Sequence, residues 1–101
     1  MGKPLDFEPN PEFTVQGCRL VQTCEACPEQ YDVFMGAAQI GYLRLRHGYF
    51  RADYPYCGGE IVYEAEPKGD GMFEDSERAA YLSAAVSALL ARFERDEWRR
   101  S

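Results

Sequence analysis

The sequence predicts one α+β domain, an antiparallel meander of four to five strands packed by one long C-terminal helix. Residues 39–56 alternate between apolar and polar side chains with the period of two that is typical of strands. Residues 74–98 carry an apolar stripe with helical spacing. The chain has 101 residues, the size of a single domain, and 46% of them are hydrophobic, enough for a core without disulfides.

The N-terminal segment differs from the rest in composition. Residues 1–12 contain three of the six prolines, which favour an extended arm, so we assign residues 13–101 to the domain. No stretch is apolar enough to cross a membrane, and the start lacks the apolar run and cleavage site of a signal peptide. We therefore expect a cytoplasmic protein with no membrane partner.

Two strands are expected before the central hairpin. Apolar and β-branched residues over 13–21 indicate a first strand, which Gly17 interrupts as a bulge. Residues 31–35 indicate a second strand, followed by a turn at Gly36 and Ala37. The register between residues 31–35 and 39–46 stays open, because both faces contain apolar residues and turns of two or four residues fit equally well.

The clearest element is a hairpin on both sides of His47 and Gly48. A two-residue turn there predicts the pairs Arg46–Tyr49, Leu45–Phe50 and Leu43–Ala52. One face of the hairpin is then apolar and is expected in the core. The other face carries the polar set Tyr42, Arg44, Arg46, Tyr49, Arg51 and Asp53.

A last strand and a long helix complete the fold. Residues 60–66 alternate again, and residues 67–71 form a loop. In the helix, the apolar stripe is Leu82, Val86, Leu89 and Phe93, and the signs of the terminal charges agree with the helix dipole. A helix over 74–98 is about 37 Å long, more than a typical strand, so we expect its end to project beyond the sheet with Trp98 exposed.

Four cysteines raise the question of a metal: Cys18, Cys24, Cys27 and Cys57. A Cys-x2-Cys pair places two thiolates on one tight turn, and zinc takes four such ligands, with His47 as a substitute for Cys18. The competing interpretation needs no cofactor, with Cys18 and Cys57 as small buried hydrophobic residues. Redox chemistry at the Cys-x2-Cys pair is a third alternative. We expect no cofactor and keep zinc as the alternative.

Residues 66–77 have the length of a calcium-binding loop. Asp70 falls at position 5 and Glu77 at the bidentate position 12, but Glu66 replaces the short aspartate of position 1 and Lys68 places a cation at a ligand position. A Gly-Asp-Gly turn whose acidic residues begin the helix explains the same sequence. Both interpretations stay open.

The motifs of common enzymes are absent from the sequence. It has one histidine and no glycine-rich phosphate loop, G-x-S-x-G or H-E-x-x-H motif, so we expect no catalytic residues. The net charge of −6 opposes non-specific binding to nucleic acid, although residues 38–58 sum to +2 while residues 59–80 sum to −5.

The arginine–tyrosine face of the hairpin has three interpretations: a solvated sheet face, a protein interface, or a surface for phosphates and stacked bases. Arginine and tyrosine are enriched at protein interfaces, and acidic segments lie on either side of the hairpin. The candidate partner-binding residues are Tyr42, Arg44, Arg46, Tyr49, Arg51, Glu64, Glu66, Asp70, Glu74 and Asp75.

The run Gln39-Ile-Gly-Tyr-Leu-Arg-Leu-Arg-His-Gly-Tyr-Phe-Arg, followed by Gly69-Asp-Gly-Met-Phe and Glu77-Arg78, resembles short accessory proteins carried by phages and prophages. The resemblance covers about half the chain. It implies an accessory protein of a mobile element; small acidic phage proteins often block a host protein, including CRISPR and other defence systems. The hypothesis is a non-enzymatic protein-binding module of this inhibitor type. The alternatives are a zinc-stabilised nucleic-acid-binding module and an oligomeric structural protein, and the oligomeric state stays open.

Overall fold

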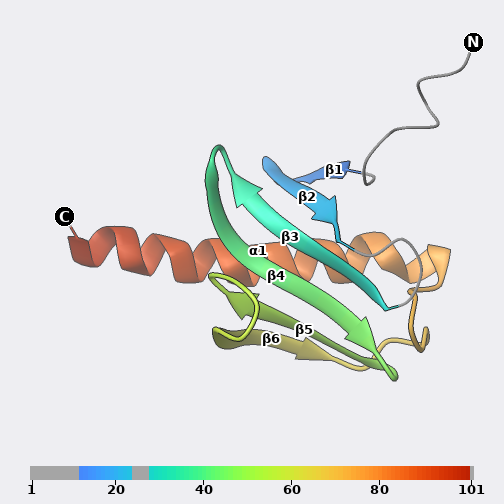
Figure 1. The fold of residues 1–101 in the computed structure, drawn as a ribbon. Coiled ribbons are helices and arrows are strands. Elements are labelled where there is room, and N and C mark those ends of the chain that lie inside the picture. Colours follow the sequence, from blue (N-terminus) through green and yellow to red (C-terminus); the bar gives the residue numbers. More distant parts are fainter. Residues whose placement is uncertain (1–11, 24–27, 101) are drawn as a thin grey trace, which may run out of the picture.

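The computed structural model describes residues 12–23 and 28–100, which form one antiparallel sheet with one helix across it (Figure 1). The elements are β1 (Glu12–Val15), β2 (Cys18–Gln22), β3 (Glu29–Met35), β4 (Ala38–Arg46), β5 (Tyr49–Tyr54), β6 (Glu60–Ala65) and α1 (Asp75–Arg100). Each strand pairs with its neighbour in the chain. The predicted α+β meander with a C-terminal helix is confirmed, but the sheet has six strands rather than four to five.

The additional strand arises at Gln16 and Gly17, where we expected only an interruption of one strand. Both residues have positive φ angles, 52° and 82°, so the chain reverses and β1 and β2 form a hairpin. Glycine adopts this conformation readily, but glutamine does so at a cost. The helix holds Gln16 in place, because its side-chain Nε2 lies 2.9 Å from the carbonyl oxygen of Ser83 and 2.9 Å from the hydroxyl of Ser87.

The β4–β5 hairpin has the predicted register. The three expected pairs, Arg46–Tyr49, Leu45–Phe50 and Leu43–Ala52, are all present. His47 and Gly48 make the turn, with φ angles of 54° and 74°. Leu43, Leu45, Phe50, Ala52 and Tyr54 are buried in the core, which confirms the face that we expected to be apolar.

The structure also settles the register between β3 and β4. A two-residue turn at Gly36 and Ala37 joins the strands. A bulge then makes Ile40 an extra residue of β4, because Phe34 pairs with Gln39 while Val33 pairs with Gly41. Ile40 is 1% exposed. The bulge therefore buries an additional apolar side chain, which strict alternation would not have predicted.

The core lies between the sheet and α1. The predicted helical stripe is confirmed: Leu82, Val86 and Leu89 are buried, and Phe93 packs against them at the edge of the core. The helix approaches the sheet closely at Gly41, where a Cβ atom would lie 2.3 Å from Cδ1 of Leu89. A side chain at this point of β4 would therefore require the buried Leu89 to move.

The C-terminal end of α1 projects past the sheet (Figure 1). The helix has 26 residues and is about 39 Å long at 1.5 Å per residue. Trp98, in its last turns, is 79% exposed, which confirms the expected exposure. In residues 12–23 and 28–100, no helix is long and apolar enough to span a membrane.

A buried carboxylate joins the sheet to the start of α1. Glu29, at the first position of β3, is 3% exposed and accepts hydrogen bonds from the backbone N–H of Phe73 at 2.9 Å, from the hydroxyl of Tyr31, and from Arg78. The Arg78 Nε atom lies 2.8 Å from Oε2 of Glu29, and a second nitrogen of the guanidinium lies 3.2 Å from Oε1. Asp75 also accepts a hydrogen bond from Arg78, at 2.7 Å. Strand and helix are thus tied through one side chain.

These contacts determine the protonation of Glu29. Burial by itself would raise its pKa, but the hydrogen bonds from Arg78, Tyr31 and Phe73 and the positive charge of Arg78 outweigh burial, so the pKa lies below its ordinary value of 4.5. Burial and the hydrogen bond to Glu29 raise the pKa of Tyr31. At neutral pH the site therefore holds a carboxylate, a neutral phenol and a guanidinium.

We predict that Glu29→Gln lowers the free energy of unfolding by about 2–4 kcal/mol, because Arg78 loses a buried counter-charge. Since the pKa of Glu29 is lower in the folded chain, its stabilisation is fully present above pH 4.5 and is lost as the pH falls through the folded-state pKa. Urea unfolding of wild type and variant between pH 7 and pH 3 tests both statements. The exposed Glu66→Gln is the matched control and should change stability by less than about 0.5 kcal/mol.

Candidate functional site

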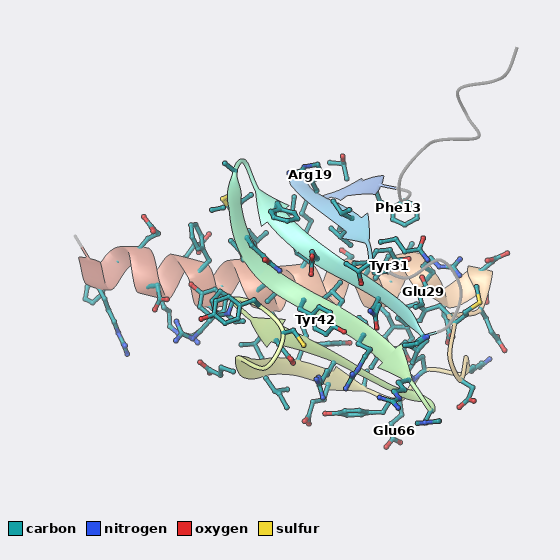
Figure 2. All side chains as sticks on the ribbon, in the orientation of Figure 1. Phe13, Arg19, Glu29, Tyr31, Tyr42 and Glu66 are labelled. Carbon is teal, nitrogen blue, oxygen red and sulfur yellow. The ribbon has the colours of Figure 1, made fainter. Side chains whose placement is uncertain are left out.

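The face of the sheet opposite α1 is not covered by any helix of the described residues (Figures 1 and 2). Its side chains alternate along the strands with those of the core. We call it the open face and define it by Arg19, Phe34, Tyr42, Arg44, Arg46, Tyr49, Arg51, Asp53 and Glu64. The expected outward set of the hairpin is thus on one face, and strands on both sides of the hairpin add to it.

A loop covers one end of the open face. Asp53 is 1% exposed, and its Oδ2 accepts a hydrogen bond of 3.0 Å from the backbone N–H of Gly58, which holds the β5–β6 loop against the sheet. Its Oδ1 lies 3.0 Å from Nε of Arg51, an ion pair whose atoms are not aligned for a hydrogen bond. Arg51 therefore neutralises a buried carboxylate and is less available to a partner than its place on the face suggests.

Tyr42 lies beneath the same end of the open face. It is only 7% exposed, although we expected its ring to meet solvent or a partner. Its hydroxyl donates to the side-chain oxygen of Gln30 at 3.2 Å. Burial raises the pKa of Tyr42, and the neighbouring Cys57 raises it further. The reason for the difference is the loop with Cys57, which folds back over the strand and which strand periodicity does not reveal.

The exposed part of the open face is centred on Arg44 and Arg46. Neither makes an ion pair within residues 12–23 and 28–100, whereas Arg51, Arg78 and Arg92 each do. Arg44 also lies directly opposite Arg51, a cation, across β4 and β5. Two arginines that form no ion pair with a described residue can bind an acidic or carbonyl-rich partner.

Tyr49 and Glu64 lie beside these arginines. The Tyr49 hydroxyl donates to Oε2 of Glu64 at 2.8 Å, and this hydrogen bond raises the pKa of Tyr49. Glu66 follows β6 by one residue and therefore lies at the same end of the hairpin (Figure 2). The cationic centre of the open face thus has an acidic border.

The open-face residues outside the hairpin on β2 and β3, Arg19 and Phe34, were not among the sequence candidates. The guanidinium of Arg19 lies 4.7 Å from the ring centre of Phe34, and the two residues are paired across β2 and β3. They extend the arginine–aromatic pattern beyond the hairpin. Arg19 stands between buried Cys18 and Leu20, an alternation visible in the sequence, but its neighbours in space depend on the β2–β3 register.

The remaining acidic candidates divide into two groups. The backbone oxygen of Asp70 accepts the N–H of Gly48 at 2.7 Å, so Asp70 lies at the hairpin turn, where it lines a cavity of about 260 Å³ with Arg46 and His47. Glu74 and Asp75 lie at the start of α1, which packs on the other face of the sheet (Figure 1). The structure therefore brings Glu64, Glu66 and Asp70 to the open-face border but does not bring Glu74 and Asp75 there.

The loop over 66–77 is closed by its own amides. Both carboxylate oxygens of Glu77 accept backbone N–H groups, from Lys68 at 2.9 Å, Gly69 at 2.8 Å and Glu74 at 3.0 Å. The bond to Glu74 is the reciprocal half of a capping box. The position that would bind calcium in the EF-hand alignment thus caps the helix, and no group of three metal-ligating side chains is found in the parts of the chain that the structure describes.

The structure does not bring the described cysteines together. Cys18 is 1% exposed in the core beside α1, and burial raises the pKa of its thiol. Cys57 is exposed in the β5–β6 loop, on the other side of the sheet. Cys24 and Cys27 lie outside the described residues. His47 is in the β4–β5 turn at the far end of β5 from Cys57.

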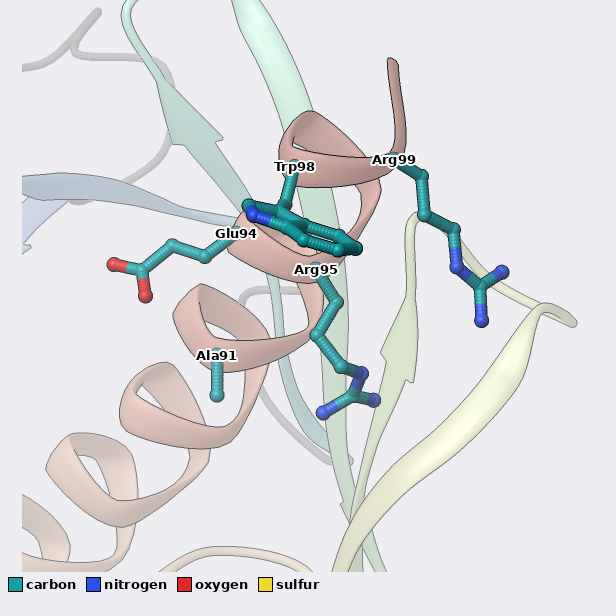
Figure 3. A pocket seen from close by; sticks show the side chains of 5 residues that line it. All are labelled: Ala91, Glu94, Arg95, Trp98 and Arg99. Atoms are coloured by element: carbon teal, nitrogen blue, oxygen red, sulfur yellow. The ribbon is translucent and has the colours of Figure 1, made fainter. Parts of the chain in front are cut away.

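The projecting end of α1 forms a second surface. A shallow cavity of about 480 Å³ is lined by Ala91, Glu94, Arg95, Trp98 and Arg99, all from the last turns of the helix (Figure 3). One exposed aromatic ring among charges of both signs defines no ligand by itself.

Comparisons with protein-family models, with curated proteins and with solved structures find no match to this chain.

We predict different costs for the two described cysteines. Cys18→Ala should lower the free energy of unfolding by about 1–2 kcal/mol, because it removes a buried side chain. Cys57→Ala should change it by less than about 0.5 kcal/mol, because that side chain is exposed. Thermal unfolding with and without a chelator tests this. Equal costs that both vanish in chelator would instead show that the two residues serve one metal site.

Proposed function

We propose that this chain is a non-enzymatic protein-binding module that contacts its partner through the open face. The observation that supports the proposal is the pair Arg44 and Arg46, which form no ion pair with a described residue and lie beside Tyr49 on a sheet surface that no described helix covers. Arginine and tyrosine are the residues that most often dominate the binding free energy of protein interfaces.

The charges around the pair favour a protein over a nucleic acid. Glu64, Glu66 and Asp70 border the cationic centre, and they would repel a phosphate backbone passing across it. A protein surface can match such a pattern, because it can place an acid against Arg44 and a base against Glu64. The net charge of −6 also opposes binding to a nucleic acid.

The resemblance to phage-borne proteins suggests what kind of partner this is. We propose further that the partner is a host protein, such as a CRISPR or other defence component, and that binding inhibits it. The resemblance rests mainly on the stretch 39–51. This stretch forms most of β4 and the first residues of β5, so it contains both arginines at the centre of the open face.

We predict that Arg44→Glu combined with Arg46→Glu lowers recovery of the partner at least about tenfold, since two charges reverse at the centre of the interface. Affinity purification from cells that carry the gene, followed by mass spectrometry, tests this. The control is Arg95→Glu combined with Arg99→Glu, which makes the same charge change on the exposed end of α1. Circular dichroism of each variant verifies that it is folded.

Two outcomes would contradict the proposal. Equal recovery of partner by wild type and the Arg44/Arg46 variant would move the interface away from the open face. Binding of labelled single-stranded RNA or duplex DNA at about 1 μM or tighter in physiological salt, lost in the same variant, would identify the open face as a nucleic-acid surface instead.

A further inference from the structure

A groove lies between β1 and the first half of α1, away from the open face. Its volume is about 420 Å³, within the range of pockets that hold a large side chain or a small ligand. The apolar lining consists of Phe13 and Val15 on the strand and Ala79 and Leu82 on the helix. Phe13 is 40% exposed, so an aromatic ring forms part of the open wall. The groove is therefore apolar, accessible and bounded by regular elements.

The strand beside the groove has an open edge. β1 pairs only with β2 among the described strands. In a hairpin with a two-residue turn the closing pair, Val15 and Cys18, is hydrogen-bonded, and hydrogen-bonded and non-hydrogen-bonded pairs then alternate. Thr14 consequently directs its backbone N–H and C=O away from β2, toward the groove that it also lines. No described residue pairs with these groups.

Both ends of the groove are fixed before any ligand arrives. Near the β1–β2 turn, Gln16 is hydrogen-bonded to Ser83 and Ser87 of α1. At the other end, Arg78 is held by Glu29 and Asp75. A site with walls fixed in this way loses little conformational entropy when it binds a ligand.

From these observations we propose that the groove is a peptide-binding site, in which an extended segment of a partner protein adds to β1 as a further strand. Strand addition at a sheet edge combines main-chain hydrogen bonds with pockets for alternate side chains. The segment would pair with Thr14 and place one apolar side chain against Phe13, Ala79 and Leu82. This site goes beyond the proposed function, because it lies on a different surface and does not require the open face.

The charges of the groove specify the ligand further. Asp75 is 98% exposed at the start of α1, although its Oδ1 already accepts a hydrogen bond from Arg78 at 2.7 Å. The guanidinium of Arg78 is held by Glu29 and Asp75. The groove lining therefore offers a basic side chain of the ligand one exposed carboxylate, and it offers an acidic side chain no arginine that is not already paired. Along an extended peptide, side chains two residues apart on one face are about 7 Å from each other. The rise along α1 from Asp75 to Ala79 is about 6 Å. Two such side chains of the ligand can therefore reach Ala79 and Asp75 at the same time.

The direction of the added strand follows from the sheet. Every described pair of strands is antiparallel, and β1 runs in the same direction as α1, with Phe13 near Asp75 and Gln16 near Ser83. An antiparallel ligand thus places its C-terminal end at Asp75. The recognised segment is an apolar residue, any residue, then lysine or arginine.

Selection from a displayed library of random octapeptides on the full chain tests the proposal. We expect recovered peptides to share the apolar-x-basic pattern and to shift the amide resonances of residues 13–15 and 79–82. Ala79→Arg should weaken the best recovered synthetic peptide at least about tenfold, because the arginine fills the groove. Ala80→Arg is the matched control, since Ala80 is equally exposed on α1 but does not line the groove. It should bind as wild type does.

A second pair of variants tests strand addition itself. Thr14→Pro removes the outward N–H, and an edge strand tolerates this because the hydrogen bonds to β2 come from the neighbouring residues. It should weaken the peptide at least about tenfold, whereas Thr14→Val keeps the N–H and should not. In a library selected on Asp75→Lys, the basic position should be replaced by an acidic one.

Three results would overturn the proposal: no enrichment, peptides that bind wild type, Ala79→Arg and Thr14→Pro equally, or at least about tenfold tighter binding by a chain that begins at Glu12. The last would show that residues 1–11 occupy the groove. Peptide binding by the Arg44/Arg46 variant should equal that of wild type. The proposal of a peptide site and the proposal of an open-face interface can thus be contradicted independently of each other.

Discussion

The ion pair between Glu29 and Arg78 connects three parts of the chain that the sheet hydrogen bonds do not connect. Glu29 begins β3, Phe73 ends the loop after β6, and Arg78 is in the first turn of α1. A buried carboxylate is costly unless its oxygens are fully hydrogen-bonded, and here three donors satisfy them. These hydrogen bonds therefore fix both the distance of the helix start from β3 and the direction in which the helix leaves it. With the start fixed, the apolar stripe lies along the sheet and the C-terminal turns project beyond it.

One helix on a six-stranded sheet leaves two kinds of surface uncovered. The first is the face opposite the helix, which can be solvated in an antiparallel sheet but needs polar side chains. The second is the edge, where β1 is short and bordered by the helix. The β5–β6 loop covers part of the face and buries Asp53 and Tyr42, which leaves Arg44 and Arg46 as its exposed centre. Both proposed interfaces are thus consequences of the same architecture.

The sequence was sufficient where a local pattern determines the structure. The turn at His47 and Gly48 fixed the β4–β5 register, and the spacing of Leu82, Val86 and Leu89 fixed the buried face of α1. The sequence was insufficient where contacts between residues distant in the chain determine the structure. At the β1–β2 turn the side chain of Gln16 is bound by the helix, and the bulge in β4 places Ile40 in the core; neither contact is contained in a local pattern. The same limit applies to the sites: the burial of Tyr42 and the β1–α1 groove arise from tertiary contacts that no periodicity contains.

The two surfaces should also differ in their response to acid, because different forces hold them. The groove ends at Arg78 and Asp75, whose positions depend on an ionised Glu29 with Tyr31 as its neutral donor. When the pH falls through the lowered pKa of Glu29, Arg78 loses its buried partner and the start of α1 loosens. Arg44 and Arg46 are positioned instead by the backbone ladder between β4 and β5, which does not include Glu29. Loss of the Glu29 charge should therefore act on the peptide groove, whose end it holds in place, and not on the pairing that positions the two arginines.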